Sequence, residues 1–274
     1  MTPQSLFDLH GKTALVTGGA TGIGLMACEG LVQAGARVLI ASRKGEACEA
    51  VADQLNALDA PGSAEGFAGD VGSEDGVAAL TEAVSARTDS LHILMNNAGT
   101  TWGAPLGDFP YKAFDRVFSV NVTGMFMLTQ SLLPLLRTAA TPDDPARVVN
   151  VGSVMGEIPM GDGAYSYAFS KSAVHQLTRI LAKELAADAI TVNALAPGPF
   201  VSNMTAFATA DEATRERVGE GVPVGRVGRP EDIAGTMQYL CGRAGSYVTG
   251  AVIPLSGGIN VTTGPSIFDR AREV

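Results

Sequence analysis

Short apolar runs alternate with longer stretches of helical periodicity along almost the whole chain. The short runs lie at residues 12–18, 37–42, 64–70, 91–99, 146–153, 190–198 and 250–258. The helical stretches lie at residues 23–35, 45–58, 74–86, 111–139, 164–186 and 230–242. Two parallel neighbouring strands must be joined by a crossover, which is usually a helix, so strands that alternate with helices indicate a parallel sheet. The pattern predicts an α/β fold, a Rossmann-type doubly wound parallel sheet of seven strands with helices on both faces.

No linker or change of composition interrupts this alternation, so we expect residues 1–274 to form a single dinucleotide-binding domain. Residues 202–228 depart from the pattern, since they are charged and only weakly periodic. A long excursion of this kind is often a mobile lid over a binding site. The alternative is a passive insertion at the surface.

Composition and charge narrow the range of partners. The net charge is −9, with a pI near 4.8, which provides no positive field to attract nucleic acid or an anionic membrane. The first residues contain no apolar run suited to a signal peptide, and no segment approaches the ~20 apolar residues of a membrane span. We therefore expect a cytoplasmic protein without nucleic-acid or membrane partners.

The cysteines and histidines are too scattered for a metal site. Cys28, Cys48 and Cys241 have no ligand spacing and are typical of buried thiols in a reducing compartment. The histidines are similarly distant from one another: His10, His92 and His175. We expect neither disulfides nor a bound metal.

The first strand ends in "TGGATGIG", a glycine-rich turn before a helix. Glycines there allow the backbone to approach a ligand, and the helix N-terminus offers free N–H groups and a positive dipole end to a pyrophosphate. The position between strand and helix favours this interpretation over a tight turn alone. The predicted contacts are Gly18, Thr21, Gly22, Ile23 and Gly24.

The end of the second strand, "ASRKG", indicates which dinucleotide is bound. A carboxylate here would bind a ribose 2′-hydroxyl, but the chain has Ser42, Arg43 and Lys44. One cation–phosphate pair at ~4 Å is worth about 4 kcal/mol at a dielectric near 20, before desolvation costs. NADP(H) is favoured over NAD(H), unless the two cations only begin a solvated helix. Asp70, after the third strand, could accept from the adenine amino group or cap the next helix.

"YSYAFSK", residues 165–171, contains two tyrosines and one lysine. At about 100° per helical residue, Tyr167 shares a face with Lys171, whereas Tyr165 lies about 240° round from the lysine. A nearby ammonium stabilises phenolate and is expected to lower the pKa of Tyr167. A tyrosine of this kind suits general acid–base catalysis, because hydride transfer to a carbonyl leaves an alkoxide that must be protonated.

Several other motifs stand in order with this pair. They are "TGGATGIG", "NNAG" at 96–99, "NVTG" at 121–124, Ser153, "YAFSK" at 167–171 and "APGP" at 196–199. Together they resemble the short-chain dehydrogenase/reductase family, in its single-domain branch, over nearly the whole chain. The stretches "NNAGTTWGAP", "QSLLPLLR", "GSVMG" and "VGRVGRPEDIA" are similar to bacterial NADPH-dependent 3-oxoacyl reductases of the rhamnolipid-associated kind.

The resemblance implies a catalytic set. Tyr167 would be the proton donor, and Lys171 would bind the nicotinamide ribose and depress the tyrosine pKa. Ser153 would hydrogen-bond the substrate carbonyl, and Asn121 would hold a water linking Lys171 to solvent. The implied further cofactor contacts are Asp70, Val71, Asn97, Ala98, Gly99, Pro197, Gly198 and Ser202, the last in place of a common threonine. Ser153 and Tyr167 are fourteen apart, one more than is usual, and we expect a bulge within 155–163.

The expected substrate pocket is largely apolar. Its candidate residues are Thr101, Trp102, Met155, Ile158, Met160, Pro199, Phe200, Met204 and Phe207. Adaptable methionines suggest an apolar or extended ketone as the small-molecule carbonyl substrate, in preference to a sugar. Taken singly, each residue is equally compatible with a place in the core.

Two alternatives to an NADP(H)-dependent reductase stay open, an NAD-dependent alcohol dehydrogenase and a non-catalytic cofactor-sensing protein. The intact catalytic-type residues argue against the second. The family resemblance also implies a homodimer or homotetramer formed through the long helices near 112–138 and 164–187. Apolar positions in "MFMLTQSLLPLL" exceed what one buried face needs, which is consistent with a second, intermolecular face.

Overall fold

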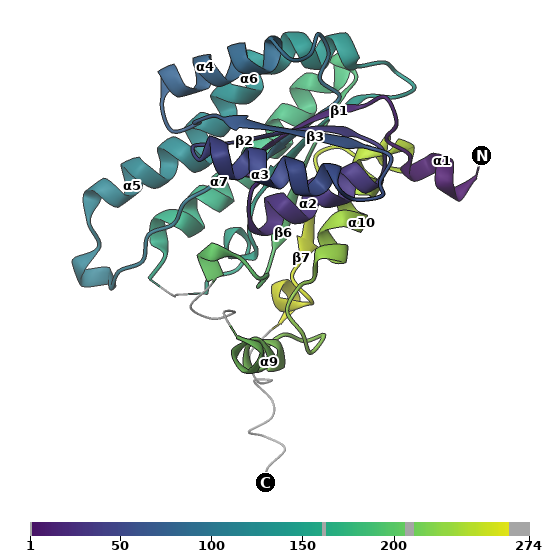
Figure 1. Ribbon diagram of the computed structural model, residues 1–274. Helices are drawn as coiled ribbons and strands as arrows, with labels where there is room; N and C mark the ends of the chain where they lie inside the picture. The colour runs from purple at the N-terminus through teal and green to yellow at the C-terminus, as the bar shows by residue number, and fades with distance from the viewer. Residues whose placement is uncertain (1, 161–162, 206–210, 263–274) are drawn as a thin grey trace.

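The structure, a computed structural model, describes residues 2–160, 163–205 and 211–262 (Figure 1). Seven parallel strands form one sheet in the order β3-β2-β1-β4-β5-β6-β7, which confirms the predicted fold class. The strands are β1 (Thr13–Thr17), β2 (Arg37–Ser42), β3 (Ser63–Ala68), β4 (Ile93–Asn96), β5 (Ala146–Val151), β6 (Ile190–Pro197) and β7 (Val252–Leu255). Strands β2 and β3 are added on one side of β1, and β4 to β7 on the other side. Sheets of this kind bind ligands at such a switch point, which here lies between β1 and β4.

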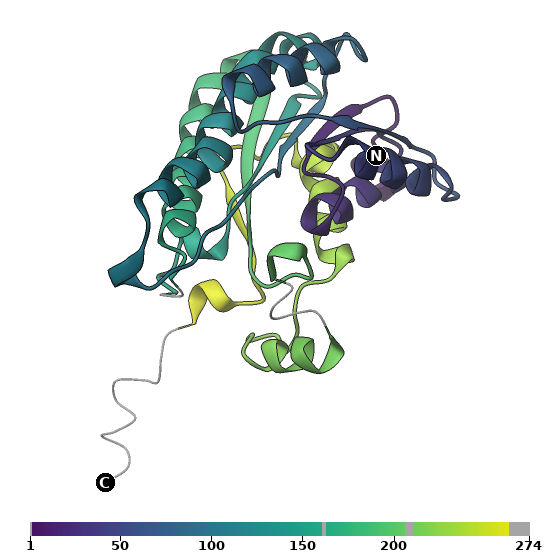
Figure 2. The ribbon, with the colours of Figure 1, turned by 60° about the vertical axis from the view of Figure 1, so that its left-hand side comes forward.

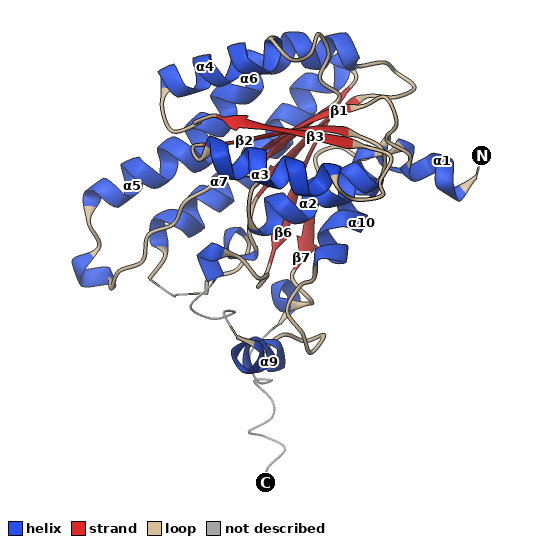
Figure 3. Ribbon diagram, in the orientation of Figure 1, coloured by secondary structure: helices blue, strands red, loops and turns tan. Residues whose placement is uncertain are grey.

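Helices cover both faces of this sheet (Figures 2 and 3). One layer consists of α2 (Gly22–Gln33), α3 (Gly45–Asn56) and α10 (Pro230–Cys241). The other consists of α4 (Glu74–Ser85), α6 (Met125–Ala139) and α7 (Tyr165–Leu185). The remaining α-helices of the described chain are α1 (Pro3–Phe7), α5 (Tyr111–Phe118) and α9 (Glu212–Glu220).

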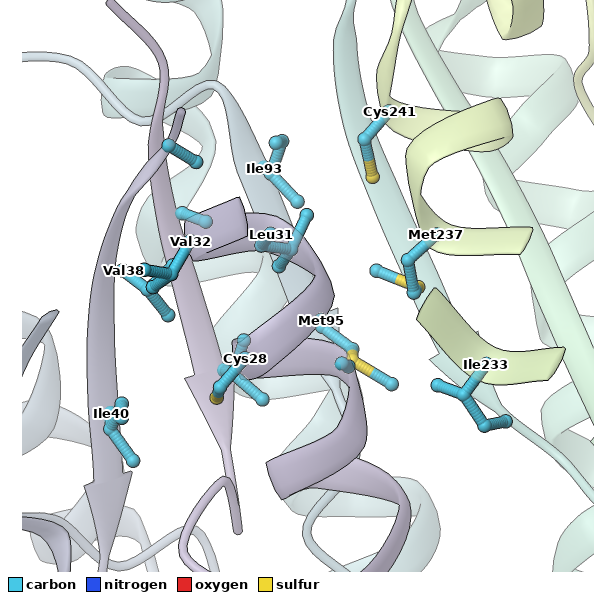
Figure 4. Close-up of a cluster of buried hydrophobic side chains, with 14 of the residues drawn as sticks. Cys28, Leu31, Val32, Val38, Ile40, Ile93, Met95, Ile233, Met237 and Cys241 are labelled. Carbon is cyan, nitrogen blue, oxygen red and sulfur yellow. The ribbon is translucent and has the colours of Figure 1, made fainter. Parts of the chain in front are cut away.

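Successive side chains of a strand point to opposite faces of the sheet, so they pack into the hydrophobic clusters on opposite faces. Val38 and Ile40 of β2 lie on the face that α2 and α3 cover, in the cluster that Figure 4 shows. Leu39, between them, is buried in the cluster on the opposite face. Both faces are therefore covered, which explains why the strands read as continuous apolar runs. The three cysteines, Cys28, Cys48 and Cys241, are buried and unpaired, as expected.

A buried polar chain crosses the centre of the sheet. Asn96 at the end of β4 lies opposite Asn150 of β5, and its Nδ2 donates to the Asn150 Oδ1 at 2.9 Å. The Asn150 Nδ2 donates in turn to the Thr178 hydroxyl of α7 at 3.0 Å. The Asn96 amide also donates to Thr129 of α6. These side chains connect two strands and two helices where the surroundings are otherwise apolar.

The stretch predicted as one long helix is interrupted. A π-helical segment, η2 (Ser119–Gly124), separates α5 from α6 and contains Asn121. Gly124 packs so closely that a Cβ there would lie 1.9 Å from the Val71 carbonyl oxygen. The expectation that no segment could span a membrane is too strict, because Tyr111–Ala139 qualifies by length and composition. In the structure one face of α6 packs on the sheet through Leu128, Leu132 and Leu136.

The segment 202–228, which departs from the alternation of strands and helices, begins and ends beside the sheet. A single bridge joins Phe200 to Gly228 at its neck. It contains α9, which the weak periodicity did not predict. The N-cap of this helix is Asp211, whose Oδ1 accepts from the Thr214 N–H at 2.8 Å. Figure 1 shows α9 beyond the carboxyl ends of the strands.

Candidate active site

A cleft of about 900 Å³ opens at the carboxyl ends of β1, β4, β5 and β6. The residues directly after these strands line it, so the sheet topology alone brings the "TGGATGIG", "NNAG", "GSVMG" and "APGP" motifs together. The helix face bearing Tyr167 and Lys171 forms part of the wall. These motifs and the Tyr167–Lys171 face of α7 therefore surround one cleft.

The glycine turn after β1 is built for a closely approaching anion. Gly18 and Gly22 have φ of +67° and +55°, where a side chain would be strained. A Cβ at Gly24 would lie 2.5 Å from the Asn97 Nδ2. Thr21, the N-cap of α2, makes no side-chain capping bond, so the first N–H groups of this helix are not capped by that side chain.

Asn97 fixes this turn against the end of β4. Its Nδ2 donates to the carbonyl oxygens of Thr17 at 2.9 Å and of Gly18 at 3.0 Å. The Asn97 N–H donates back to the Thr17 hydroxyl at 3.1 Å. The two strand ends on either side of the topological switch are thereby held at a fixed separation.

The end of β2 presents its cations to solvent. Arg43 and Lys44 are exposed, and among the described residues the Arg43 guanidinium makes no ion pair or hydrogen bond. Ser42 accepts from the Lys44 N–H at 3.2 Å and contacts the Cys48 Sγ at 3.1 Å. The hydroxyl therefore shapes the turn that carries the two cations.

Asp70 does not cap the helix after β3. The N-cap of α4 is Ser73, which accepts from the Gly76 N–H at 3.1 Å. The Asp70 Oδ1 instead accepts from the Gly72 N–H at 2.9 Å, which rigidifies the turn, while Val71 is buried beside it. The capping alternative for Asp70 is therefore wrong.

Tyr167 and Lys171 lie on one face of α7 as predicted. The Lys171 Nζ lies 5.4 Å from the centre of the Tyr167 ring and donates to the Val151 carbonyl oxygen at 2.7 Å. The Ser153 hydroxyl accepts from the Met155 N–H at 3.2 Å and hydrogen-bonds the Tyr167 phenol. Three polar side chains thus converge within the cleft.

The expected lowering of the Tyr167 pKa is not found. Burial raises the pKa of the Tyr167 phenol above its usual value, and the hydrogen bond from Ser153 offsets this only in part. The reason is that desolvation penalises the phenolate, while the ammonium lies over the ring face. Burial also lowers the pKa of Lys171 to about 8. Tyr167 is thus a neutral phenol at neutral pH.

Asn121 lies behind the lining of the cleft, where its side-chain oxygen and nitrogen are both hydrogen-bonded. Its Oδ1 accepts from the Thr100 N–H at 2.8 Å, and its Nδ2 donates to the Thr100 carbonyl at 3.0 Å and the Ser170 hydroxyl at 2.9 Å. The Oδ1 of Asn121 and the Nζ of Lys171 both flank Gly99, at 3.5 and 3.8 Å from where a Cβ would stand. π-helical turns often occur at functional sites.

Most of the predicted site residues line the cleft. These are Gly18, Thr21, Gly22, Ile23, Asn97, Ala98, Gly99, Ser153, Tyr167, Lys171, Pro197, Gly198 and Ser202, with Thr101, Met155, Met160, Pro199, Phe200 and Met204 of the substrate set. Others lie outside its lining: Gly24, Ser42, Arg43, Lys44, Asp70, Val71, Asn121, Trp102 and Ile158. Phe207 and part of the 155–163 loop fall outside the described residues.

The sequence reasoning missed one wall of the cleft. Val218, Gly221 and Val222 of the α9 region line it together with Ile259. Their only sequence signal is a pair of valines in a charged segment. Ser202 lies beside the glycine turn, where a Cβ on Gly22 would approach the Ser202 Cβ to 2.9 Å.

Comparison with known proteins finds close similarity over nearly the whole chain. A family model described as enoyl-(acyl carrier protein) reductase matches residues 18–260. The rhamnolipids biosynthesis 3-oxoacyl-(acyl-carrier-protein) reductase of Pseudomonas aeruginosa is 47% identical over 255 residues, covering 93% of this chain and 98% of that protein. Gluconate 5-dehydrogenase of Gluconobacter oxydans is 34% identical, covering 96% and 100%. The solved Pseudomonas aeruginosa RhlG/NADP active-site complex has a TM-score of 0.90 at 46% identity, covering 95% and 100%.

Proposed function

The chain belongs to the short-chain dehydrogenase/reductase family, and from this premise we propose that it transfers hydride between NADP(H) and a ketone or secondary alcohol. The observation that carries the proposal is the convergence of Ser153, Tyr167 and Lys171 in the cleft that the glycine turn also lines. A protein that only sensed the cofactor would have no physical need for a buried phenol in contact with a serine hydroxyl.

The residues present fit a dinucleotide phosphate. The positive-φ glycines and the start of α2 suit the pyrophosphate, and the exposed Arg43 and Lys44 suit a 2′-phosphate. The relative crystallised with NADP, at 46% identity, supports the same choice. When bound, NADPH supplies the hydride.

Each residue of the catalytic set then has a distinct role. Tyr167 donates its proton to the carbonyl oxygen of the substrate, since its raised pKa keeps the phenol protonated at neutral pH. The Ser153 hydroxyl hydrogen-bonds the same oxygen and stabilises the developing charge. The buried Lys171 ammonium binds the ribose and favours the phenolate that forms. Asn121 belongs to the relay that returns a proton through Lys171, a role supported by the position of both residues beside Gly99.

We propose an apolar, uncharged substrate of the 3-oxoacyl type. The side chains that complete the cleft are Met155, Met160, Met204, Val218 and Val222, and Lys171 is the only charged side chain among its described lining residues. A sugar acid would bring a carboxylate that needs a cation or several donors there. The greater identity to the 3-oxoacyl reductase, 47% against 34% for the gluconate enzyme, favours the same class.

The residues around 202–228 serve as a substrate lid in this proposal, and residues 1–274 as one functional domain. Support for the lid comes from Val218, Gly221 and Val222, which line the cleft although α9 lies beyond the strand ends. Unpaired buried thiols support a reducing, cytoplasmic location. The chain assembles as a homodimer or homotetramer through the α5, α6 and α7 surface.

The test is a steady-state screen that follows NADPH oxidation with ketones, gluconate-type keto acids and short and long 3-oxoacyl thioesters. We expect turnover with 3-oxoacyl thioesters and little with charged keto sugars. Tyr167→Phe, which removes only the hydroxyl, should lose at least a hundredfold in kcat while binding NADPH normally. Tight NADPH binding without turnover of any carbonyl would favour the sensor, and undiminished turnover in Tyr167→Phe would overturn the assigned proton donor.

A further inference from the structure

His175 occupies a position beside the catalytic serine that the proposed chemistry does not use. It stands one turn after Lys171 and two turns after Tyr167 on the same face of α7, and its side chain is 3% exposed. The Ser153 N–H donates to the His175 Nε2 at 3.4 Å, inside the protein. The ring therefore contacts the backbone of the residue whose hydroxyl faces the substrate.

The loop around Ser153 is shaped to receive this ring. A Cβ on Gly152 would stand 2.1 Å from the His175 Nε2, and a Cβ on Gly156 would stand 2.8 Å from the Cε1. Any larger residue at either glycine would displace the imidazole. The imidazole ring therefore explains why glycine stands at both ends of "GSVMG", at Gly152 before Ser153 and at Gly156 after it.

The ring is neutral and oriented to accept. Burial, with the charges of Arg179 and Lys171, lowers the pKa of His175 to about 4. A neutral imidazole has one acceptor and one donor nitrogen, so acceptance at Nε2 leaves the proton on Nδ1. The Ser153 hydroxyl meanwhile accepts from the Met155 N–H, which leaves its own proton to donate.

We propose that His175 is a positioning residue, which holds the Ser153 backbone so that the serine hydroxyl stays aligned with Tyr167 and the substrate carbonyl. The inference rests on the proposed reductase function. Without the Nε2 acceptor, the buried Ser153 N–H loses its partner, and the loop shifts to find another. The effect should fall on kcat, because the Ser153 hydrogen bond strengthens as charge develops on the carbonyl oxygen.

The experiment is a double-mutant cycle between His175 and Ser153. His175→Leu removes the acceptor, while His175→Gln keeps an oxygen near the Nε2 position and serves as the matched control. In the enzyme that retains Ser153, we expect His175→Leu to lower kcat about tenfold and to change KM and the NADPH Kd less than twofold. His175→Gln should retain most of the wild-type kcat. In a Ser153→Ala background, His175→Leu should change kcat less than twofold.

A second measurement does not depend on turnover. Hydrogen exchange of a peptide spanning residues 149–157 should quicken in His175→Leu and return toward the wild-type rate in His175→Gln. Equal loss of kcat in both backgrounds, or unchanged exchange in the leucine variant, would overturn the positioning role. If the wild-type protein turned over no carbonyl compound, the reductase proposal would be wrong. The hydrogen-exchange result would still decide whether His175 orders this loop.

Discussion

At the scale of single residues, burial decides the protonation of Tyr167 and Lys171, because it raises the pKa of the tyrosine and lowers that of the lysine. Tyr167 and Lys171 share a face of α7 because four residues make slightly more than one turn. The direction of the tyrosine pKa depends on burial by segments far away in the chain, which a local motif does not encode. The His175 contact with Ser153 was missed for the same reason, since only the packed structure shows which glycines surround the ring.

Ketone reduction should depend on pH through Lys171. The pKa of this residue is lowered to about 8 by burial, so its ammonium is present below that pH and lost above it. Tyr167, with a raised pKa, stays protonated across the same range. We expect kcat/KM for reduction to be level near neutral pH and to decline as the pH rises through about 8.

The measurement is the pH–rate profile of kcat/KM with a neutral ketone, in buffers of constant ionic strength. Oxidation of the corresponding alcohol, which requires the phenolate, should rise only at higher pH, because the pKa of Tyr167 is raised above its usual value. Any activity that Lys171→Arg retains should lack the decline, because arginine stays charged. A wild-type reduction profile that stays level to pH 10 would contradict the role of the ammonium.

At the scale of elements, the short apolar runs predicted all seven strands, and the stretches of helical periodicity predicted the main helices. Both signals are local patterns of apolar residues in the sequence. The interruption at Ser119–Gly124 was not predictable, since it accompanies the close approach of Gly124 to the Val71 carbonyl. Helix α9 was also missed, because its charged sequence has little apolar periodicity to detect.

The end of β2 should decide the choice of dinucleotide. Arg43 is exposed and has no partner among the described residues, so a 2′-phosphate would not compete with an existing ion pair. We expect Arg43→Ala to raise the NADPH Kd about tenfold and to change the NADH Kd less than twofold. Calorimetry or quenching of cofactor fluorescence would measure both.

A matched control removes a cation elsewhere. Arg243 is exposed in the turn after α10, and Arg243→Ala should leave both dissociation constants unchanged. If wild type bound NADPH and NADH equally, the 2′-phosphate argument would fail and the NAD-dependent alternative would gain ground.

At the scale of the whole molecule, the apolar surface of the α5 and α7 region exceeds what this chain alone can bury. Tyr111 is 82% exposed and Phe169 is 58% exposed, although Phe114 of α5 packs against Phe169. Surfaces of this kind commonly become buried between subunits. We expect the purified protein to have the mass of a dimer or tetramer, and Phe169→Glu to reduce it.

Light scattering coupled to size-exclusion chromatography, at micromolar protein, measures this. Leu58→Glu is the matched control, because Leu58 is a similarly exposed apolar residue (42%) just beyond the end of α3. A monomeric wild type, or an equal loss of mass in both variants, would contradict the proposed interface.

The whole-molecule arrangement of the cleft was only partly predictable. Parallel topology brings the ends of β1, β4, β5 and β6 to one edge, so most lining residues followed from their motifs. The wall formed by Val218, Val222 and Ile259 depends on how the 202–228 segment and the region after β7 fold back, and no local pattern encodes that.

The hydrogen-bonded pair Asn96 and Asn150 has a consequence for assembly of the catalytic centre. A slip of β4 against β5 would break the hydrogen bond between the two amides and leave the buried Asn150 Oδ1 without its donor, at roughly 1–3 kcal/mol. Only one alignment of the strands escapes that penalty. It brings level the segments that follow, 97–99 on one strand and 151–153 on the other. The position of Ser153 relative to residues 97–99 is thus set by two amides in the interior.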